Sequence, residues 1–300
     1  MLRTSRRLAL AAVGLLSLAA PGLAQATAAD AYYERALMAA ADQRCRLFTP
    51  QLASALQAAE AQARGAALRS GFSGGQLAQV EARAEAKVAG VACNSRDIAL
   101  AATRVRTAFE DYAKLVRMSY PGDVADWRAD RSTSRRSPIW KLSQTDAVGG
   151  GRLVFGLAGE DGPSALVAVA AFPDGAQPYA ARLVMRDPAL APVPFINALQ
   201  SSNGRAPLAA RTPPRSATRA IMAEARAAAD PTLLPPGARG GVAFRFPKAA
   251  VQALAALDPR EAVAVDFLFA SAAGPDRVRT AYVEVGDFAA GEAFLAANQR

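Results

Sequence analysis

The hydrophobic period of this chain changes once, and this change constrains the fold more than any other feature. Up to Met118 the apolar residues recur at intervals of three or four, as on one face of a helix. Beyond Pro138 they alternate with polar residues, as in a half-buried strand. We therefore predict an α+β protein. An antiparallel bundle of about four helices would be followed by a mainly antiparallel β-sandwich or half-open barrel with short helices.

The clearest predicted helix runs from Ser95 to Met118. Its apolar side chains form one stripe, made of Ile98, Ala102, Val105, Phe109, Tyr112 and Val116. Ser95 offers a hydroxyl to the unpaired backbone N–H groups of the first turn, so it is the predicted N-cap. The segment 120–122 (YPG) is expected to end this helix.

Three further helices are predicted at 31–47, 50–69 and 76–93. Thr49 followed by Pro50 is a strong start signal for the second of them, because proline is tolerated at the first helical position. The short connections imply antiparallel neighbours. Alanine is frequent on the apolar stripes, which indicates closely packed helices and a thin core. The stripes leave open whether the bundle is complete in one copy or pairs in a homo-oligomer.

The chain has two cysteines, and the expected path of the helices brings them together. Cys45 lies near the end of the first helix and Cys93 at the end of the third, so both fall at the same pole of the bundle. We predict a disulfide between them in an oxidising compartment. In the chain-entropy model, a bridge that closes a loop of about fifty residues stabilises the folded state by roughly 4 kcal/mol. A redox role is the alternative, but the C-x-x-C motif is absent.

Residues 1–26 have the pattern of a cleaved export signal. A basic start precedes the apolar run 8–20, and the segment 24–26 (AQA) fits the small-x-small cleavage rule. The segment 5–8 (SRRL) resembles a twin-arginine motif, but Ala9 stands where that motif has a bulkier apolar residue, so both export routes stay open. No later apolar run is long enough to span a bilayer. We therefore predict a periplasmic or extracellular protein without a transmembrane span after cleavage.

The mature chain is expected to divide into a helical domain, a charged linker and a β-rich domain, at 27–119, 120–138 and 139–300. The linker holds the densest cluster of charges, around an aromatic side chain. Here Trp127, Arg128 and Arg131 are a candidate contact patch for an anionic surface or an envelope protein. The alternative is a solvated linker whose tryptophan packs on a domain edge.

The net charge of the chain is +9, and loss of the three leader arginines lowers it to +6. The remaining arginines are scattered along the chain, so we interpret the charge as a general feature of its composition rather than as a binding surface. Export argues against nucleic acid as a partner.

The β-rich part is divided by turn residues such as the Gly149–Gly151 run. We expect antiparallel strands at 139–145, 152–158, 165–172, 179–186, 242–246, 263–270 and 277–285. Short helices are expected at 248–257 and 288–297. The long segment 187–214 is irregular, and 217–229 suits either a helix or a strand.

The residue types present exclude several chemistries. The chain has no histidine, which removes imidazole acid–base catalysis and histidine-ligated zinc. No phosphate-binding, dinucleotide-binding or calcium-binding motif is present, so we predict no cofactor and no metal. What remains is a carboxylate pair, Asp266 and Glu284, on adjacent strands or just beyond. Both acids alternate with apolar neighbours, so a solvent-facing side of the sheet is the alternative interpretation.

These observations leave three functional hypotheses. The first is a non-enzymatic envelope protein that binds or scaffolds other envelope components. The second is a carboxylate-dependent hydrolase or lyase that acts on an envelope polymer through Asp266 and Glu284. The third is a carrier of a small apolar ligand inside the β-rich domain, and a filled or hollow interior distinguishes it from the others.

Overall fold

The computed structural model describes residues 21–196, 206–272 and 274–297. Helices occupy the first part of the chain up to residue 114, and two antiparallel sheets follow. The prediction of an α+β protein is therefore confirmed. The predicted leader, residues 1–26, lies largely outside the described residues.

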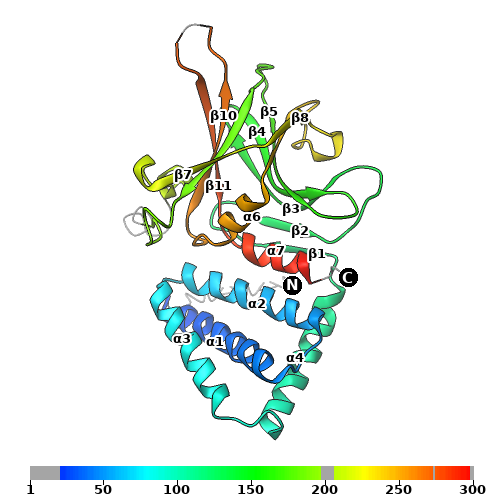
Figure 1. Ribbon diagram of the computed structural model, residues 1–300, viewed down its shortest axis with the longest axis vertical. Coiled ribbons are helices and arrows are strands. Elements are labelled where there is room, and N and C mark those ends of the chain that lie inside the picture. The colour runs from blue at the N-terminus through cyan, green and yellow to red at the C-terminus, as the bar shows by residue number, and fades with distance from the viewer. Residues whose placement is uncertain (1–20, 197–205, 273, 298–300) are drawn as a thin grey trace, which may run out of the picture.

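Four helices build the first half: α1 (Pro21–Cys45), α2 (Pro50–Arg69), α3 (Gly74–Ala89) and α4 (Arg96–Lys114). α2 is the central helix, because it packs against α1, α4 and the C-terminal helix α7 (Phe288–Ala296). α3 packs on α1, and α3 and α4 meet at their connection like the arms of a V (Figure 1). The helical half thus touches the β-rich half mainly through α2 and α7.

The predicted starts of two helices are confirmed by their caps. The Leu52 N–H donates to Thr49 Oγ1 at 3.4 Å, and the Ile98 N–H donates to Ser95 Oγ at 3.3 Å. The third helix begins earlier than predicted, because Ser73 forms a capping box with Gln76. The first helix also begins before the predicted residue 31, at Pro21.

The predicted end of α4 at Met118 is wrong. The helix ends at Lys114, and strand β1 (Arg117–Tyr120) begins almost at once. The Arg131 N–H donates to the Val116 carbonyl at 2.8 Å, so this segment pairs with a neighbouring strand instead of extending the helix. Strand pairing here overrides an apolar pattern that continues the helical spacing.

The predicted disulfide is confirmed. Cys45 and Cys93 are bonded, with their Cα atoms 5.5 Å apart and a sequence separation of 48. The bridge ties the end of α1 to the connection between α3 and α4. It therefore links three of the four helices at one pole.

The larger sheet has seven strands in the order β1-β2-β3-β4-β5-β9-β8. After β1, its strands are β2 (Trp127–Asp130), β3 (Ile139–Val148), β4 (Gly151–Gly159), β5 (Ala165–Ala171), β9 (Val242–Phe246) and β8 (Ala225–Ala228). The predicted glycine turn joins β3 to β4, where Gly149 and Gly150 adopt φ values of +46° and +79°. Glycine adopts such angles without the clash that a Cβ would cause.

The smaller sheet has four strands in the order β11-β10-β6-β7. They are β11 (Arg277–Glu284), β10 (Ala262–Phe269), β6 (Ala180–Arg186) and β7 (Thr218–Met222). Short helices complete the described chain: α6 (Lys248–Ala255), η1 (Leu208–Arg211), η2 (Arg215–Ala217) and η3 (Pro231–Leu233).

One prediction about the β-rich half needs correction, and the structure completes two others. The segment 120–138, predicted as a linker, contributes β2 to the larger sheet, because Trp127 and Ala129 point into the core. The ambiguous segment 217–229 forms the strands β7 and β8. The strand predicted at 179–186 is present as β6 and belongs to the smaller sheet, and the described strands number eleven, more than the seven expected from the sequence.

One apolar core serves both sheets and α7. Large buried side chains fill it: Trp127, Phe155, Phe244, Phe246, Phe267, Phe288 and Phe294. Several of these rings meet edge to face, as Trp127 does with Phe288 at 5.1 Å between centroids. α7 lies between this core and α2 (Figure 1). The close approach needs Gly65 on α2, because a Cβ there would overlap Oδ1 of Asp287.

Candidate functional site

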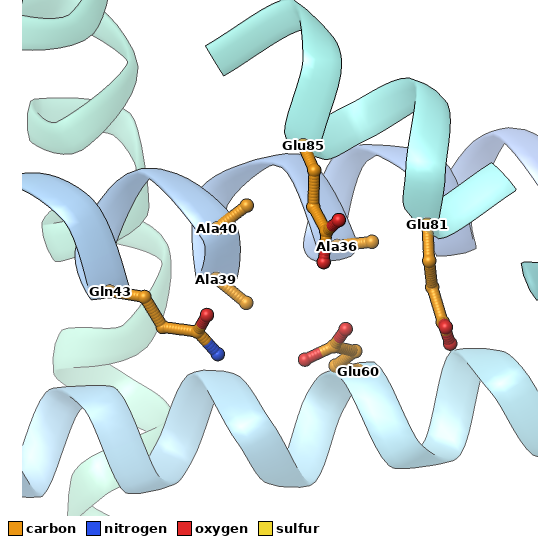
Figure 2. A pocket seen from close by; sticks show the side chains of 7 residues that line it. All are labelled: Ala36, Ala39, Ala40, Gln43, Glu60, Glu81 and Glu85. Carbon is orange, nitrogen blue, oxygen red and sulfur yellow. The ribbon is translucent and has the colours of Figure 1, made fainter. Parts of the chain in front are cut away.

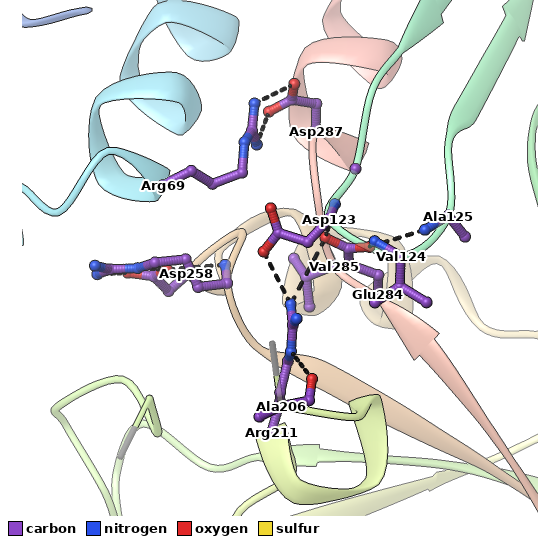
Figure 3. A network of polar contacts seen from close by, with 12 residues as sticks. Arg69, Asp123, Val124, Ala125, Ala206, Arg211, Asp258, Glu284, Val285 and Asp287 are labelled. Carbon is purple, nitrogen blue, oxygen red and sulfur yellow. Dashed lines mark hydrogen bonds and ion pairs between the residues drawn. The ribbon is translucent and has the colours of Figure 1, made fainter. Parts of the chain in front are cut away.

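Glu284, one of the two predicted acids, lies at the end of β11 and is fully buried. The N–H groups of Asp123, Val124 and Ala125 donate to its carboxylate oxygens at 2.8, 2.8 and 3.1 Å. Figure 3 shows the three donors converging on this side chain from the β1–β2 connection. The solvent-facing interpretation of Glu284 is therefore wrong. This carboxylate holds a loop in place.

Asp266, the second predicted acid, lies in a different part of the same sheet. Arg182 Nε donates to Asp266 Oδ2 at 2.9 Å, and Thr280 Oγ1 donates to its Oδ1 at 2.7 Å. The register pairs Asp266 with Thr280, four residues before Glu284. Four residues of strand separate two positions by about 13 Å, which exceeds the spacing of either class of glycosidase pair. The structure does not bring the two acids together, and it buries both.

Asp146 is a carboxyl group that the sequence analysis missed. It lies on β3, and its Oδ2 atom is buried without a hydrogen-bond partner among the described residues. Burial and the nearby Glu284 carboxylate raise the pKa of Asp146 to about 7. Strand β3 packs against β11, which explains why two acids so far apart in sequence interact. No sequence signal marked it, because the pattern around Asp146 is that of an ordinary strand.

Two arginines extend this network toward the helices (Figure 3). Arg211, almost fully buried, donates to Asp123 Oδ2 at 3.0 Å and lies 3.9 Å from Glu284 Oε1. Arg69 of α2 forms a two-pronged pair with Asp287 at 2.7 and 2.8 Å. Burial raises the pKa of Asp287, although Arg69 opposes that effect. These ion pairs fix η1 and α2 against the β-rich half.

The predicted contact patch is not assembled on the surface. Trp127 is fully buried, and its Nε1 donates to the Glu284 and Val285 carbonyls at 3.1 and 3.0 Å. Arg131 donates to the Phe294 carbonyl at 2.7 and 2.9 Å and stacks on the ring of that residue. Arg128 is exposed on the opposite face of β2. Trp127 and Arg131 thus join β2 to β11 and to the end of α7.

A cleft of about 200 Å³ opens between α1, α2 and α3. Glu60, Glu81 and Glu85 point into it from two helices, and Gln43 lies at one end (Figure 2). Burial, together with the neighbouring Glu81, raises the pKa of Glu60. The buried Tyr32 hydroxyl donates to Glu81. The cleft is acidic, and α1 supplies the hydroxyl that bonds to one of its glutamates.

Two further findings concern ligands and membranes. Within the ranges that the structure describes, no group of three or more acidic or cysteine side chains has an arrangement suited to a metal ion. In the same ranges, no helix combines the length and the apolar character needed to cross a bilayer.

Comparisons with known proteins give no match: no family model, no curated protein and no solved structure matches the chain. The site therefore has to be interpreted from its own geometry. Its acidic groups hold loops and helices together, and one of them, Asp146, combines burial with a missing partner.

Proposed function

We propose that this chain is an exported protein of the cell envelope that binds or scaffolds other envelope components and does not catalyse a reaction. The observation that carries the proposal is the Cys45–Cys93 disulfide, because such bonds persist mainly in oxidising compartments outside the cytosol. The leader pattern over residues 1–26 supports the same compartment.

The architecture supports a binding role. The two sheets share one filled core, which we interpret as a sandwich, and the four helices, which we interpret as an open bundle, stand to one side of it. The buried acids of this core are engaged in structural contacts, as Glu284 is with three backbone N–H groups. We propose that the exposed edges and helices provide the binding surfaces.

The test of export is made on the protein produced by its native cell. The mature protein is expected in the envelope fraction, beginning at Thr27, and alkylation without a reducing agent should label no thiol. A variant with Cys45→Ser supplies the control, because it leaves one thiol that the reagent must detect. A full-length protein in the cytosol with two reactive thiols would refute the proposal.

The non-enzymatic part of the proposal has its own test. The purified protein should leave cell-wall glycan, peptide and ester substrates unchanged over long incubations. Steady turnover of any of these that increases in proportion to protein concentration would contradict it.

One observation favours a second candidate, a carboxylate-dependent hydrolase or lyase. The pair involved would be Asp146 and Glu284 rather than Asp266 and Glu284, because Glu284 helps to raise the pKa of Asp146 to about 7. An acid and a base in unlike environments are the usual requirement of such catalysis. Activity that survives in the Asp146→Asn variant would eliminate this candidate.

The third hypothesis, a carrier of an apolar ligand, is weakened by the filled core. Phe155, Phe244 and Phe267 are at most 1 % exposed and occupy the space between the sheets. A native mass spectrum that shows a bound lipid would restore the carrier hypothesis.

A homo-oligomer through the helical half stays a proposal as well. α3 buries only Leu77, Val80, Ala84 and Val88, so most of its surface is exposed. Light scattering after size-exclusion chromatography measures the mass directly.

A further inference from the structure

The larger sheet ends in β8, a strand whose outer edge has no neighbour among the described residues. All four of its residues are exposed. The Ala229 N–H donates to the Gly241 carbonyl at 3.0 Å, in the same register that pairs Ala227 with Ala243. In an antiparallel pair the backbone groups of alternate residues point to opposite sides. The N–H and C=O groups of Arg226 and Ala228 therefore face outward, where an added strand can bond to them.

A cleft of about 190 Å³ lies beside this edge. Phe244, Ala181, Ala223 and Glu224 line it together with residues of β8. Tyr179 at its rim is 50 % exposed, and the nearby Met222 is 51 % exposed. Side chains of a strand alternate between the two faces of a sheet, so every second side chain of an added strand would point toward this cleft. Its volume suits one apolar side chain.

The charges at the edge favour an acidic partner. Within the described ranges Arg226 makes no ion pair, and its guanidinium donates to the Pro178 carbonyl and to the Gln177 side-chain oxygen at 2.8 and 3.4 Å. Arg245, across from β8, is paired with Glu224 at 3.0 Å. After loss of the leader arginines the chain carries +6. A carboxylate beside β8 would find a guanidinium that lacks an acidic partner, whereas a second copy would bring another Arg226 close to it.

We propose that β8 is a docking edge, at which an extended acidic peptide of a partner protein pairs as an additional strand and places one apolar side chain in the adjacent cleft. Backbone bonds to a free edge give affinity, and the cleft and Arg226 give selectivity. This inference rests on the proposed binding function and names the class of partner.

The test uses two synthetic seven-residue peptides with leucine at position 4 and threonine at the odd positions. One has glutamate at positions 2 and 6, so that leucine and glutamate share the strand face that meets the cleft and Arg226, and the other has lysine in place of glutamate. Fluorescence anisotropy with the full mature protein measures both. The glutamate peptide is expected to bind saturably and at least about tenfold more tightly than the lysine peptide.

The decisive variant is Ala228→Pro. Proline removes the outward N–H of residue 228, which bonds to no other residue that the structure describes, and edge strands tolerate proline there. Binding of the glutamate peptide should weaken about tenfold or more, because one strand-pairing bond is lost and the ring blocks the edge. Ala228→Val, which keeps the N–H, is the matched control and should bind as the parent chain does.

Arg226→Glu tests the charge and keeps the proposal falsifiable if the proline variant fails to fold. This variant should bind the glutamate peptide more weakly and the lysine peptide more tightly than the parent chain does. Absence of binding up to millimolar peptide, equal binding of both peptides, or binding that neither variant changes would overturn the docking edge. A dimer that Ala228→Pro dissociates would also overturn it, because a second copy would then occupy β8.

The two proposals fail separately. A protein that binds the glutamate peptide but stays in the cytosol with free thiols refutes the proposed function alone. An exported protein with an intact disulfide that binds neither peptide refutes the docking edge alone.

Discussion

The two halves of the molecule bury apolar surface in different ways. The β-rich half has one large core of aromatic and branched side chains that both sheets share, and a second small cluster around Val169 and Leu233. The helical half has two small clusters, in which alanines such as Ala41, Ala63 and Ala67 take many positions. Stabilisation by burial grows with apolar area, so the helices gain less from packing. We therefore expect the stability of the helical half to depend on the Cys45–Cys93 disulfide, whereas the apolar core suffices for the β-rich half.

The largest effect is expected from truncating the aromatic core. Phe267→Ala should destabilise the protein by about 3–5 kcal/mol, because the ring is fully buried and meets Phe172 and Phe244. Denaturant unfolding followed by tryptophan fluorescence measures the loss. Leu268→Ala, one residue along and on the opposite face, is the matched control. A loss of stability no larger than that of the control would show that the core is less important than its packing implies.

The next effect concerns the disulfide. Replacing Cys45 and Cys93 by serine together should cost about 2–4 kcal/mol, and the loss should fall on α1, α3 and α4. Far-ultraviolet circular dichroism during thermal unfolding should show a new, earlier transition. Reduction of the parent protein should reproduce this transition. A variant that unfolds in one unchanged step would mean that α2 and α7 alone hold the helices.

The free energy of unfolding is expected to depend on pH through Asp146, which lies where β3 packs against β11. The pKa of Asp146 in the folded chain, about 7, lies above that of an exposed aspartate, so ionisation opposes folding. The protein is most stable with respect to Asp146 below about pH 4, where this carboxyl group is protonated in both states. Its free energy of unfolding falls as the pH rises from there toward about 7. Asp146→Asn should therefore be up to about 4 kcal/mol more stable than the parent chain at pH 8, with the difference vanishing near pH 4.

Unfolding in urea across this pH range measures the effect. Asp161→Asn, at an exposed position in the β4–β5 turn, is the control and should show little change, because exposed ion pairs contribute little. A stability difference for Asp146→Asn that is the same at pH 4 and pH 8 would contradict the burial of an uncompensated carboxyl group.

The smallest effect concerns the contact between the halves. Gly65→Ala should cost about 1–2 kcal/mol, because the added methyl group displaces the Asp287 carboxylate from Arg69. Gly75→Ala in the first turn of α3 meets open space, and alanine should stabilise that helix by up to about 1 kcal/mol. Thermal unfolding of both variants decides the matter. Equal effects of the two substitutions would mean that α2 does not approach α7 as closely as described.

Local signals in the sequence predicted much of the fold. Thr49 and Ser95 marked helix starts, and the Gly149–Gly151 run marked the β3–β4 turn, because each acts on its own neighbours. The end of α4 was missed, since it depends on the pairing of β1 with β2. The disulfide was predicted from the positions of two helix ends, which the helix lengths determine.

The candidate site was far less predictable. Glu284 receives its N–H donors from residues about 160 positions away, and Arg211 reaches Asp123 across 88 positions. An alternating pattern reports which residues share a face, but it does not report what covers that face. Asp266 and Glu284 were therefore expected to face solvent, although η1 and the β1–β2 connection lie against this sheet.

Hydrogen exchange measured by mass spectrometry, on oxidised and reduced protein under native conditions, tests the difference between the halves most directly. The account predicts that reduction increases exchange in α1, α3 and α4, while β4, β5 and β10 keep their protection. Equal loss of protection in both halves, or no change in the helices, would contradict it.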